Sequence, residues 1–212
     1  AQEPRLVDSV RGTTKYLDAS LNIAETTSTN ILTSFDTDGF TLGNNAISNL
    51  NGNTHVAWNW KAGTTTGIAT NGDTDITPSS YSFNQTSGFS VLKYTGNGTS
   101  GVGVAHGLNA KPQFFIVKRL DAISDWQVYF QPVLNVSNAT KYLVLDGNNE
   151  ETVNINKWNG YQPDATNFYL GNDGQTNTSS SDYIGYVFAN IKGFSKFGSY
   201  VGNGSTDGTF IY

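Results

Sequence analysis

Two histidines are the side chains best suited to act as general bases in this sequence. His55 and His106 are its only imidazoles, and imidazole is the side chain that titrates near neutral pH. His55 precedes Val56 in a strand-like stretch, and His106 stands at an expected strand end. The chain contains no cysteine, and no nucleophile-elbow motif marks a serine for attack. We therefore assign neither histidine a catalytic role.

Six carboxylates in the second half of the chain could supply the acid pair of a glycosidase, in which two carboxyl groups face one sugar. The candidates are Asp121, Asp125, Asp146, Glu150, Glu151 and Asp164. Most of them stand beside Gly or Asn in expected turns, where Asp commonly accepts hydrogen bonds from backbone N–H groups. We favour this turn role, and we predict that the protein is not an enzyme.

Asp36 and Asp38 are the candidate metal ligands. They stand two residues apart and before Gly39, as at the start of a calcium loop. No Glu closes such a loop at its twelfth position. A tight turn ahead of residues 40–42 accounts for the same residues, and this is the interpretation we favour. Calcium is the one cofactor that the sequence leaves open, and we predict no other.

Exposed aromatic rings beside Asn, Asp and Gln are typical of carbohydrate-binding sites, because a sugar stacks on the ring and hydrogen-bonds at its edges. Trp158 and Tyr161 in an expected loop, and Tyr129 on an expected strand, fit this pattern. These three residues are the candidates for binding surface glycans. Of the four tryptophans, only Trp158 is a candidate for exposure, and packing against the sandwich is its favoured role.

The backbone that must position these side chains is that of an all-β protein. Asn, Thr, Ser and Gly supply 91 of the 212 residues, and all four are poor helix formers. Hydrophobic residues reach 37%, which is enough for a sizeable core. Residues 114–117 form an apolar run typical of a strand buried on both faces, and residues 126–131 alternate apolar and mixed positions. We predict an antiparallel β-sandwich of the jelly-roll or concanavalin A-like type.

Charge and hydropathy exclude two kinds of contact. The chain has 12 Lys and Arg against 17 Asp and Glu, and charged residues make up only 14% of it. Nucleic-acid binding through a basic face needs clustered Lys and Arg, so we predict no nucleic-acid partner. The sequence has no run of 18 apolar residues, so we also predict no membrane span.

The chain repeats part of itself, which is its most informative feature. Residues 14–17 (TKYL) return as residues 140–143, 126 positions later. Two further blocks return 128 positions later in the same order: 36–44 (DTDGFTLGN) as 164–172 (DATNFYLGN), and 56–60 (VAWNW) as 184–188 (IGYVF). A second series, spaced by 105 to 106 positions, relates residues 88–98 to residues 193–204 through shared GFS and GNG motifs.

The repeat also bears on Val56, Trp58 and Trp60, which share one side of an expected strand. Tyr186 and Phe188 occupy the positions that match the two tryptophans. An aromatic residue present in both copies is better explained as core than as a ligand contact. We therefore expect Trp58 and Trp60 to be buried.

The chain is out of phase with its own repeat. Residues 1–63 form the back half of a unit, residues 64–87 a connecting arm, residues 88–192 a complete unit, and residues 193–212 the opening of another. A half-unit leaves strand edges unpaired, and such edges readily pair with other chains. Either the terminal residues fold back onto residues 9–63, or they pair with a neighbouring copy, or the sequence is a piece of a longer protein. The predicted assembly residues are Tyr200, Val201, Phe210, Ile211 and Tyr212.

Several stretches, in collinear order over nearly the whole chain, carry a resemblance to a known family. They are residues 8–15 (DSVRGTTK), 40–43 (FTLG), 56–63 (VAWNWKAG), 106–108 (HGL), 112–119 (PQFFIVKR), 193–200 (GFSKFGSY) and 202–208 (GNGSTDG). On these residues the chain resembles an uncharacterised repeat domain of virion structural and tail-fibre proteins of tailed, especially marine, bacteriophages. The resemblance implies a lectin-like or SPRY-associated β-sandwich located on a virion or outside a cell.

Together these features predict a non-enzymatic structural or adhesive protein of the tail-fibre or surface-fibre type, which assembles with copies of itself. Few charges, many Thr and aromatic residues and no thiols suit an extracellular scaffold. Two alternatives predict different behaviour. A carbohydrate-binding module would be a monomer with a groove at its aromatic candidates, whereas a polysaccharide-degrading spike would hold two carboxylates about 5 to 10 Å apart.

Overall fold

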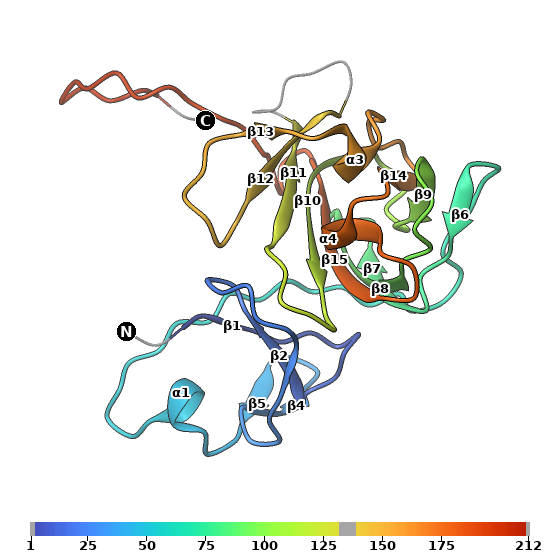
Figure 1. The fold of residues 1–212 in the computed structure, drawn as a ribbon. Coiled ribbons are helices and arrows are strands. Elements are labelled where there is room, and N and C mark those ends of the chain that lie inside the picture. Colours follow the sequence, from blue (N-terminus) through green and yellow to red (C-terminus); the bar gives the residue numbers. More distant parts are fainter. Residues whose placement is uncertain (1–2, 132–138, 211–212) are drawn as a thin grey trace.

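The computed structural model describes residues 3–131 and 139–210, and its regular structure is mostly strand (Figure 1). The first half-unit, residues 3–63, holds β1 (Arg5–Leu6), β2 (Lys15–Asp18), β3 (Thr26–Thr27), β4 (Leu32–Phe35), β5 (Phe40–Leu42) and α1 (Ala46–Asn49). Residues 64–192 span the expected arm and the expected complete unit, and from here on we call them together the complete unit. They hold β6 (Thr74–Ile76), β7 (Ser80–Asn84), β8 (Phe89–Thr95), β9 (Val102–Ala105), β10 (Pro112–Arg119), β11 (Gln127–Phe130), β12 (Lys141–Val144), β13 (Thr152–Val153), α3 (Ile155–Trp158), β14 (Asn167–Leu170), α4 (Gly174–Asn177) and β15 (Asp182–Ala189). The predicted all-β, sandwich-like fold class is confirmed.

Seven strands of the complete unit form the main sheet, in the order β13-β12-β11-β10-β15-β8-β7. Every neighbouring pair in this sheet is antiparallel. A three-stranded sheet, β14-β9-β6, packs against it, with β9 antiparallel to β14 and parallel to β6. Two small sheets, β1-β2-β3 and β4-β5, make up the first half-unit. Within the main sheet, β15 lies between β10 and β8, so both of its edges are paired.

The larger core lies between the main sheet and the three-stranded sheet. Because side chains alternate between the two faces of a strand, every second residue of β10 and β15 points into it. Phe115 and Val117 of β10 meet Val187 of β15 and Phe168 of β14 there. Trp158 of α3 closes one end, edge-on to Phe115 with ring centroids 4.9 Å apart.

Part of the opposite face of the main sheet packs against the first half-unit, drawn in blue in Figure 1. Leu17 of β2 packs with Ile184 of β15 and with Trp126 in a second buried cluster, against which Ile116 also lies. The predicted strand over residues 114–117 is confirmed. Its one face, with Phe115 and Val117, is buried in the larger core, whereas the other, with Phe114 and Ile116, is only partly buried.

The duplication predicted from the sequence is present in the strand register. β2 pairs with β3 so that Lys15 lies opposite Thr27, and β12 pairs with β13 so that Lys141 lies opposite Val153. Both members of the second pair stand 126 positions after those of the first. The two hairpins therefore have the same register.

Turn hydrogen bonds repeat as well. The Asp36 N–H donates to the Gly39 carbonyl at 2.9 Å, and the Asp164 N–H donates to the Asn167 carbonyl at 2.9 Å. These partners match at a spacing of 128 positions. The aspartates therefore begin the same turn in both copies, as the favoured interpretation of Asp36 predicts.

Gly43 and Gly171 occupy equivalent places where two backbone segments touch. A Cβ on Gly43 would lie 2.3 Å from the Asn30 carbonyl oxygen, and one on Gly171 would lie 2.1 Å from that of Asn156. Neither distance leaves room for a side chain. The shared Leu-Gly-Asn motif of the two repeats therefore has a steric basis.

Residues 64–87 do more than connect two units, which corrects the expectation of an arm. β7 is an edge strand of the main sheet, and Phe83 is buried in the larger core. Thr64 exchanges two backbone hydrogen bonds with Phe83 at 2.9 and 3.0 Å. β6 adds a third strand to the smaller sheet.

The helices within the described ranges are each four residues long. None of these is long and apolar enough to cross a membrane.

Candidate assembly surface

Two segments lie outside the sheets although their counterparts in the complete unit are strands. We name residues 54–61 the first open segment and residues 194–210 the second open segment. The first matches β15 at a spacing of 128 positions, and the second begins with the match of β8, at 105 to 106 positions. Apart from an isolated bridge between Ser195 and Ile191, neither segment pairs as a strand within the described chain.

The first open segment exposes its apolar side chains. Val56 is 74%, Trp58 75% and Trp60 57% exposed, so the prediction that both tryptophans are buried on a strand is wrong. Their counterparts Tyr186 and Phe188 are covered because β15 has a strand on each side and the first half-unit on one face. In the described chain the first open segment has no strand paired on either side and no half-unit packed over its face. The side chains of Val56, Trp58 and Trp60 are therefore exposed to solvent.

The second open segment is also exposed. Tyr200 is 69%, Val201 84% and Phe210 82% exposed. Ile211 and Tyr212, which we also predict to take part in assembly, lie outside the described residues. The three described residues are therefore at the surface, where an assembly role would need them.

The second open segment keeps the turn that follows β8. The Asn97 side chain accepts a hydrogen bond from the backbone N–H two residues later at 2.9 Å, and Asn203 does the same at 3.0 Å. Gly98 and Gly204 follow with φ angles of 73° and 64°, in the left-handed region that favours glycine. This local geometry supports the match between the segment and the β8 region.

An aromatic cluster around Phe188 lies at the base of both open segments. The Phe188 ring centroid lies 6.1 Å from that of Trp60 in the first segment and 5.8 Å from that of Phe197 in the second. Phe114 of β10 stacks on it at 5.3 Å, and Phe89 of β8 lies at 5.0 Å. The sequence analysis did not predict this cluster. The aromatic residues at alternate positions of residues 56–60 and 184–188 could have indicated it.

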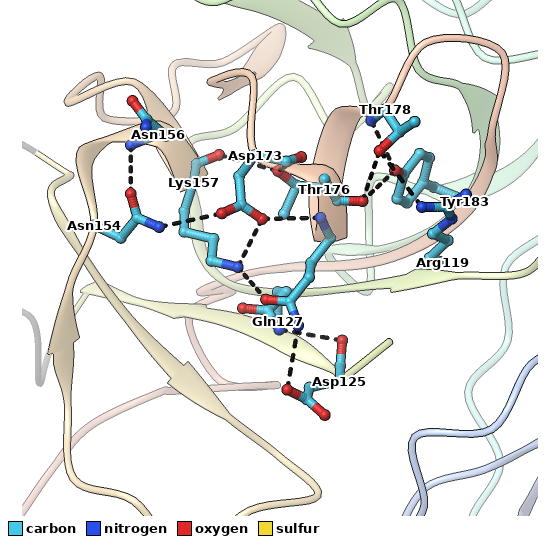
Figure 2. Close-up of polar contacts among 12 residues, drawn as sticks. Arg119, Asp125, Gln127, Asn154, Asn156, Lys157, Asp173, Thr176, Thr178 and Tyr183 are labelled. Carbon is cyan, nitrogen blue, oxygen red and sulfur yellow. Dashed lines mark hydrogen bonds and ion pairs between the residues drawn. The ribbon is translucent and has the colours of Figure 1, made fainter. Parts of the chain in front are cut away.

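A buried polar network joins α3 to α4 (Figure 2). Lys157 Nζ donates to Asp173 Oδ1 at 2.8 Å and also to the side-chain oxygen of Gln175. Asn154 donates to Asp173 Oδ2 at 3.1 Å, and Gln175 donates to Asp125 at 3.2 Å. Burial lowers the pKa of Lys157, although the hydrogen bond and charge of Asp173 oppose this shift.

The first half-unit replaces the charged pair of this network with neutral residues. Ile31 stands where Lys157 stands in the complete unit, and Asn45 stands where Asp173 stands. Asn45 and Asp173 nevertheless both cap a short helix by accepting from the backbone N–H two residues later. The cap is therefore common to both copies of the repeat, whereas the buried ion pair is particular to the complete unit.

The two histidines differ in burial. His106 is 0% exposed, its Nδ1 accepts from the Leu108 N–H at 3.2 Å, and its Nε2 lies 3.3 Å from the Asp164 carbonyl. Burial lowers its pKa to about 4, against opposing contributions from Asp164. His55 is exposed and lies outside any strand, which corrects the expected strand position.

The six carboxylates considered for glycoside hydrolysis are spread over the complete unit. Five make local structural contacts: Asp121 with Arg119, Asp125 with Gln175, Asp146 with the backbone of Trp126, Glu151 with Lys141, and Asp164 with Tyr169. Glu150 is exposed. These contacts support turn and ion-pair roles for the group.

Asp36 and Asp38, the calcium candidates, lie in the turn between β4 and β5. The Asp36 carboxylate accepts from the Thr41 hydroxyl at 2.8 Å, and both aspartates are exposed. In residues 3–131 and 139–210, three or more His, Cys, Asp or Glu side chains nowhere gather closely enough to hold a metal ion. The contacts of Asp36 therefore support the turn role.

Two of the three glycan candidates are buried. Trp158 is 0% exposed in α3, where its Nε1 donates to the Lys141 carbonyl at 3.0 Å, and Tyr129 is 2% exposed. Neither ring is accessible to a sugar, so their proposed contact with glycans is corrected, and the packing role of Trp158 is confirmed. Tyr161 is 55% exposed, with its ring edge-on to Tyr169 at 5.6 Å.

The fold and these surfaces define a class of protein: an all-β, sandwich-like domain with an internal duplication and two exposed strand-like segments. The chain belongs to the family described as a domain of unknown function, DUF7483, whose model matches residues 1–212. No curated protein and no solved structure matches the chain.

Proposed function

We propose that this chain is a non-enzymatic structural or adhesive protein of a virion or cell surface, of the tail-fibre or surface-fibre type, which assembles with copies of itself. The observation that carries the proposal is the exposure of Val56, Trp58 and Trp60 on a segment whose counterpart is an inner strand of the main sheet. Backbone of this kind pairs readily with another chain, and exposed apolar residues gathered in one stretch commonly mark contact surfaces.

A catalytic role has less support. His106 is buried and engaged by backbone groups, and the carboxylates make local contacts. A general base must reach the proton that it abstracts, and a glycosidase needs two carboxyl groups facing one sugar. Glycan binding is supported by the exposed ring of Tyr161 and by Trp58 and Trp60, which are exposed on either side of Asn59. A catalytic role does not account for these tryptophans, and stacking on a sugar does not account for the exposed Val56 of the same segment.

The size of the protein in solution tests this proposal. Light scattering over a range of concentrations should give a mass above the 22.9 kDa of one chain. Replacing Trp58 and Trp60 with Ser should weaken association by about tenfold or more, because each buried aromatic contributes about 1.5–3 kcal/mol.

Ile123→Ser is the matched control for these variants. Ile123 is 75% exposed, like Trp58, but it lies between β10 and β11, outside both open segments. Its replacement should leave association unchanged. A mass of 22.9 kDa at every concentration, or equal weakening by the control, would contradict self-assembly through the open segments.

A further inference from the structure

We infer that the first open segment of one copy pairs antiparallel with the second open segment of another copy, in the register that β15 has with β8. This inference rests on the self-assembly proposed above. It adds the identity of the partner surface and the pairing of individual residues.

The pairing of β15 with β8 in the complete unit supplies the template. The two strands are antiparallel along their whole length, from Asp182 opposite Thr95 to Phe188 opposite Phe89. At one end the rings of Phe188 and Phe89 lie 5.0 Å apart. At the other, the Thr95 hydroxyl donates to Asp182 at 2.9 Å.

Transferring this register to the open segments specifies two pairs. The 128-position spacing places Trp60 at the position of Phe188, and the 105-position spacing places Phe194 at that of Phe89. Trp60 should therefore lie opposite Phe194, as an aromatic pair like that in the complete unit. By the same transfer, with a spacing of 106 positions, Thr54 lies opposite Val201.

The transferred pairing also covers exposed apolar surface. Residues directly opposite each other in an antiparallel pair share a face, and alternate residues of a strand share that face. Trp58 and Trp60 would therefore lie on one face with Phe194, and these are 75%, 57% and 69% exposed in the single chain. The pairing would bury together side chains that the isolated chain leaves in water.

The second open segment lies 105 positions after its counterpart in the β8 region at Ser195, but 106 positions after it at Tyr200. The stretch between Ser195 and Tyr200 is one residue longer than its counterpart between Ser90 and Tyr94. An extra residue on one strand of an antiparallel pair forms a β-bulge. The inferred ladder therefore contains one bulge between these two residues.

The partner is a second copy because each chain carries both halves of the contact on segments that diverge. Both segments leave the cluster around Phe188. Figure 1 shows the second open segment, in red, projecting away at the top of the molecule, whereas the chain leading from α1 runs beside the blue first half-unit at the bottom. Two different surfaces that meet between copies make a head-to-tail contact, which builds rings or filaments.

Cysteine cross-linking tests the register directly, because the natural sequence has no cysteine. A Thr54→Cys variant is mixed under mild oxidation with a Val201→Cys variant that carries a mass tag. Both positions are exposed, so folding should be retained. We expect a disulfide-linked heterodimer on a non-reducing gel.

A Tyr200→Cys variant mixed with Thr54→Cys is the control, since Tyr200 would point to the opposite face of the ladder. It should give about tenfold less heterodimer, because a disulfide needs Cβ atoms close together on one face. A second matched pair, Asn59→Cys with Ser195→Cys, tests the other side of the bulge, where pairing between copies would replace the bridge between Ser195 and Ile191. Equal yields from the matched and control pairs would overturn the inferred register.

A chain that carries both Thr54→Cys and Val201→Cys distinguishes pairing between copies from pairing within one. A ladder of linked chains is expected. An oxidised monomer with no free thiol would mean that the segments pair within the same chain, and would overturn the inference. Association by light scattering without cross-linking at either matched pair would overturn the register and leave self-assembly standing, whereas a strictly monomeric protein would overturn both.

Discussion

The Tyr186 hydroxyl of β15 donates a hydrogen bond of 2.6 Å to Asp8 Oδ2 in the first half-unit. Arg11 Nε lies 2.7 Å from the same carboxylate oxygen, and its guanidinium also donates to the Tyr186 hydroxyl at 3.2 Å. Burial, followed by the nearby Asp8 carboxylate, raises the pKa of Tyr186 well above its ordinary value. These hydrogen bonds therefore attach the first half-unit to β15. The counterpart of β15 in the repeat is the first open segment.

Tyr186→Phe should loosen this attachment without changing the packing of the ring. The variant leaves the buried Asp8 carboxylate with one donor fewer, which should lower the free energy of unfolding by about 1–3 kcal/mol. Urea unfolding measures the change. Tyr200→Phe, at a ring that is 69% exposed, is the control and should have no effect. Equal stability of the two variants would show that the contact contributes nothing.

Replacing Lys157 and Asp173 with the residues found at the matching positions of the first half-unit should change the free energy of unfolding. Lys157→Ile alone leaves the Asp173 carboxylate without its ammonium partner, and should lower the free energy of unfolding by about 3 kcal/mol. Adding Asp173→Asn reproduces the Ile31 and Asn45 combination of the first half-unit.

The double variant should therefore recover at least about 1 kcal/mol relative to Lys157→Ile, which a double-mutant cycle in urea would measure. Additive losses from the two substitutions would contradict the equivalence of the two sites.

Gly171→Ala should strongly destabilise the complete unit. The added Cβ would lie 2.1 Å from the Asn156 carbonyl oxygen, so the two backbone segments must separate. We expect a loss of more than about 3 kcal/mol, and hence a fall in Tm of at least about 6 °C by calorimetry. At Gly72 an added Cβ meets nothing within 4 Å, so Gly72→Ala is the control. A Tm for Gly171→Ala within a degree of the control would refute the close approach.

His106 should make stability depend on pH between its ordinary pKa of 6.5 and its lowered value of about 4. In this window the unfolded chain binds a proton that the folded chain excludes. The free energy of unfolding should therefore decrease as pH falls, by up to about 3 kcal/mol, with no further loss from this group below pH 4.

Urea unfolding at a series of pH values measures this dependence. His106→Asn keeps an acceptor near the Leu108 N–H and should flatten the curve in this window. His55→Asn, at an exposed position, should keep the natural slope. If His106→Asn keeps that slope as well, another group is responsible.

Much of the fold was predictable because its signals are local. The recurrence of residues 14–17 and 36–44 in one order indicated the duplication, and the structure repeats their register and turn bonds. A turn depends on residues within a few positions of it, so two stretches that both begin with Asp can build the same turn in both copies. Asp36 and Asp164 are an example.

The sequence alone indicated an all-β chain with an internal repeat, since residue types and their spacing are read directly from it. Tertiary structure alone decided burial. Trp58 and Tyr186 share a position in the repeat, yet one is 75% and the other 7% exposed. Strands from distant parts of the chain flank Tyr186, and in the described chain none flanks Trp58. Burial depends on what lies beside a strand, and a strand's own residues do not encode its neighbours.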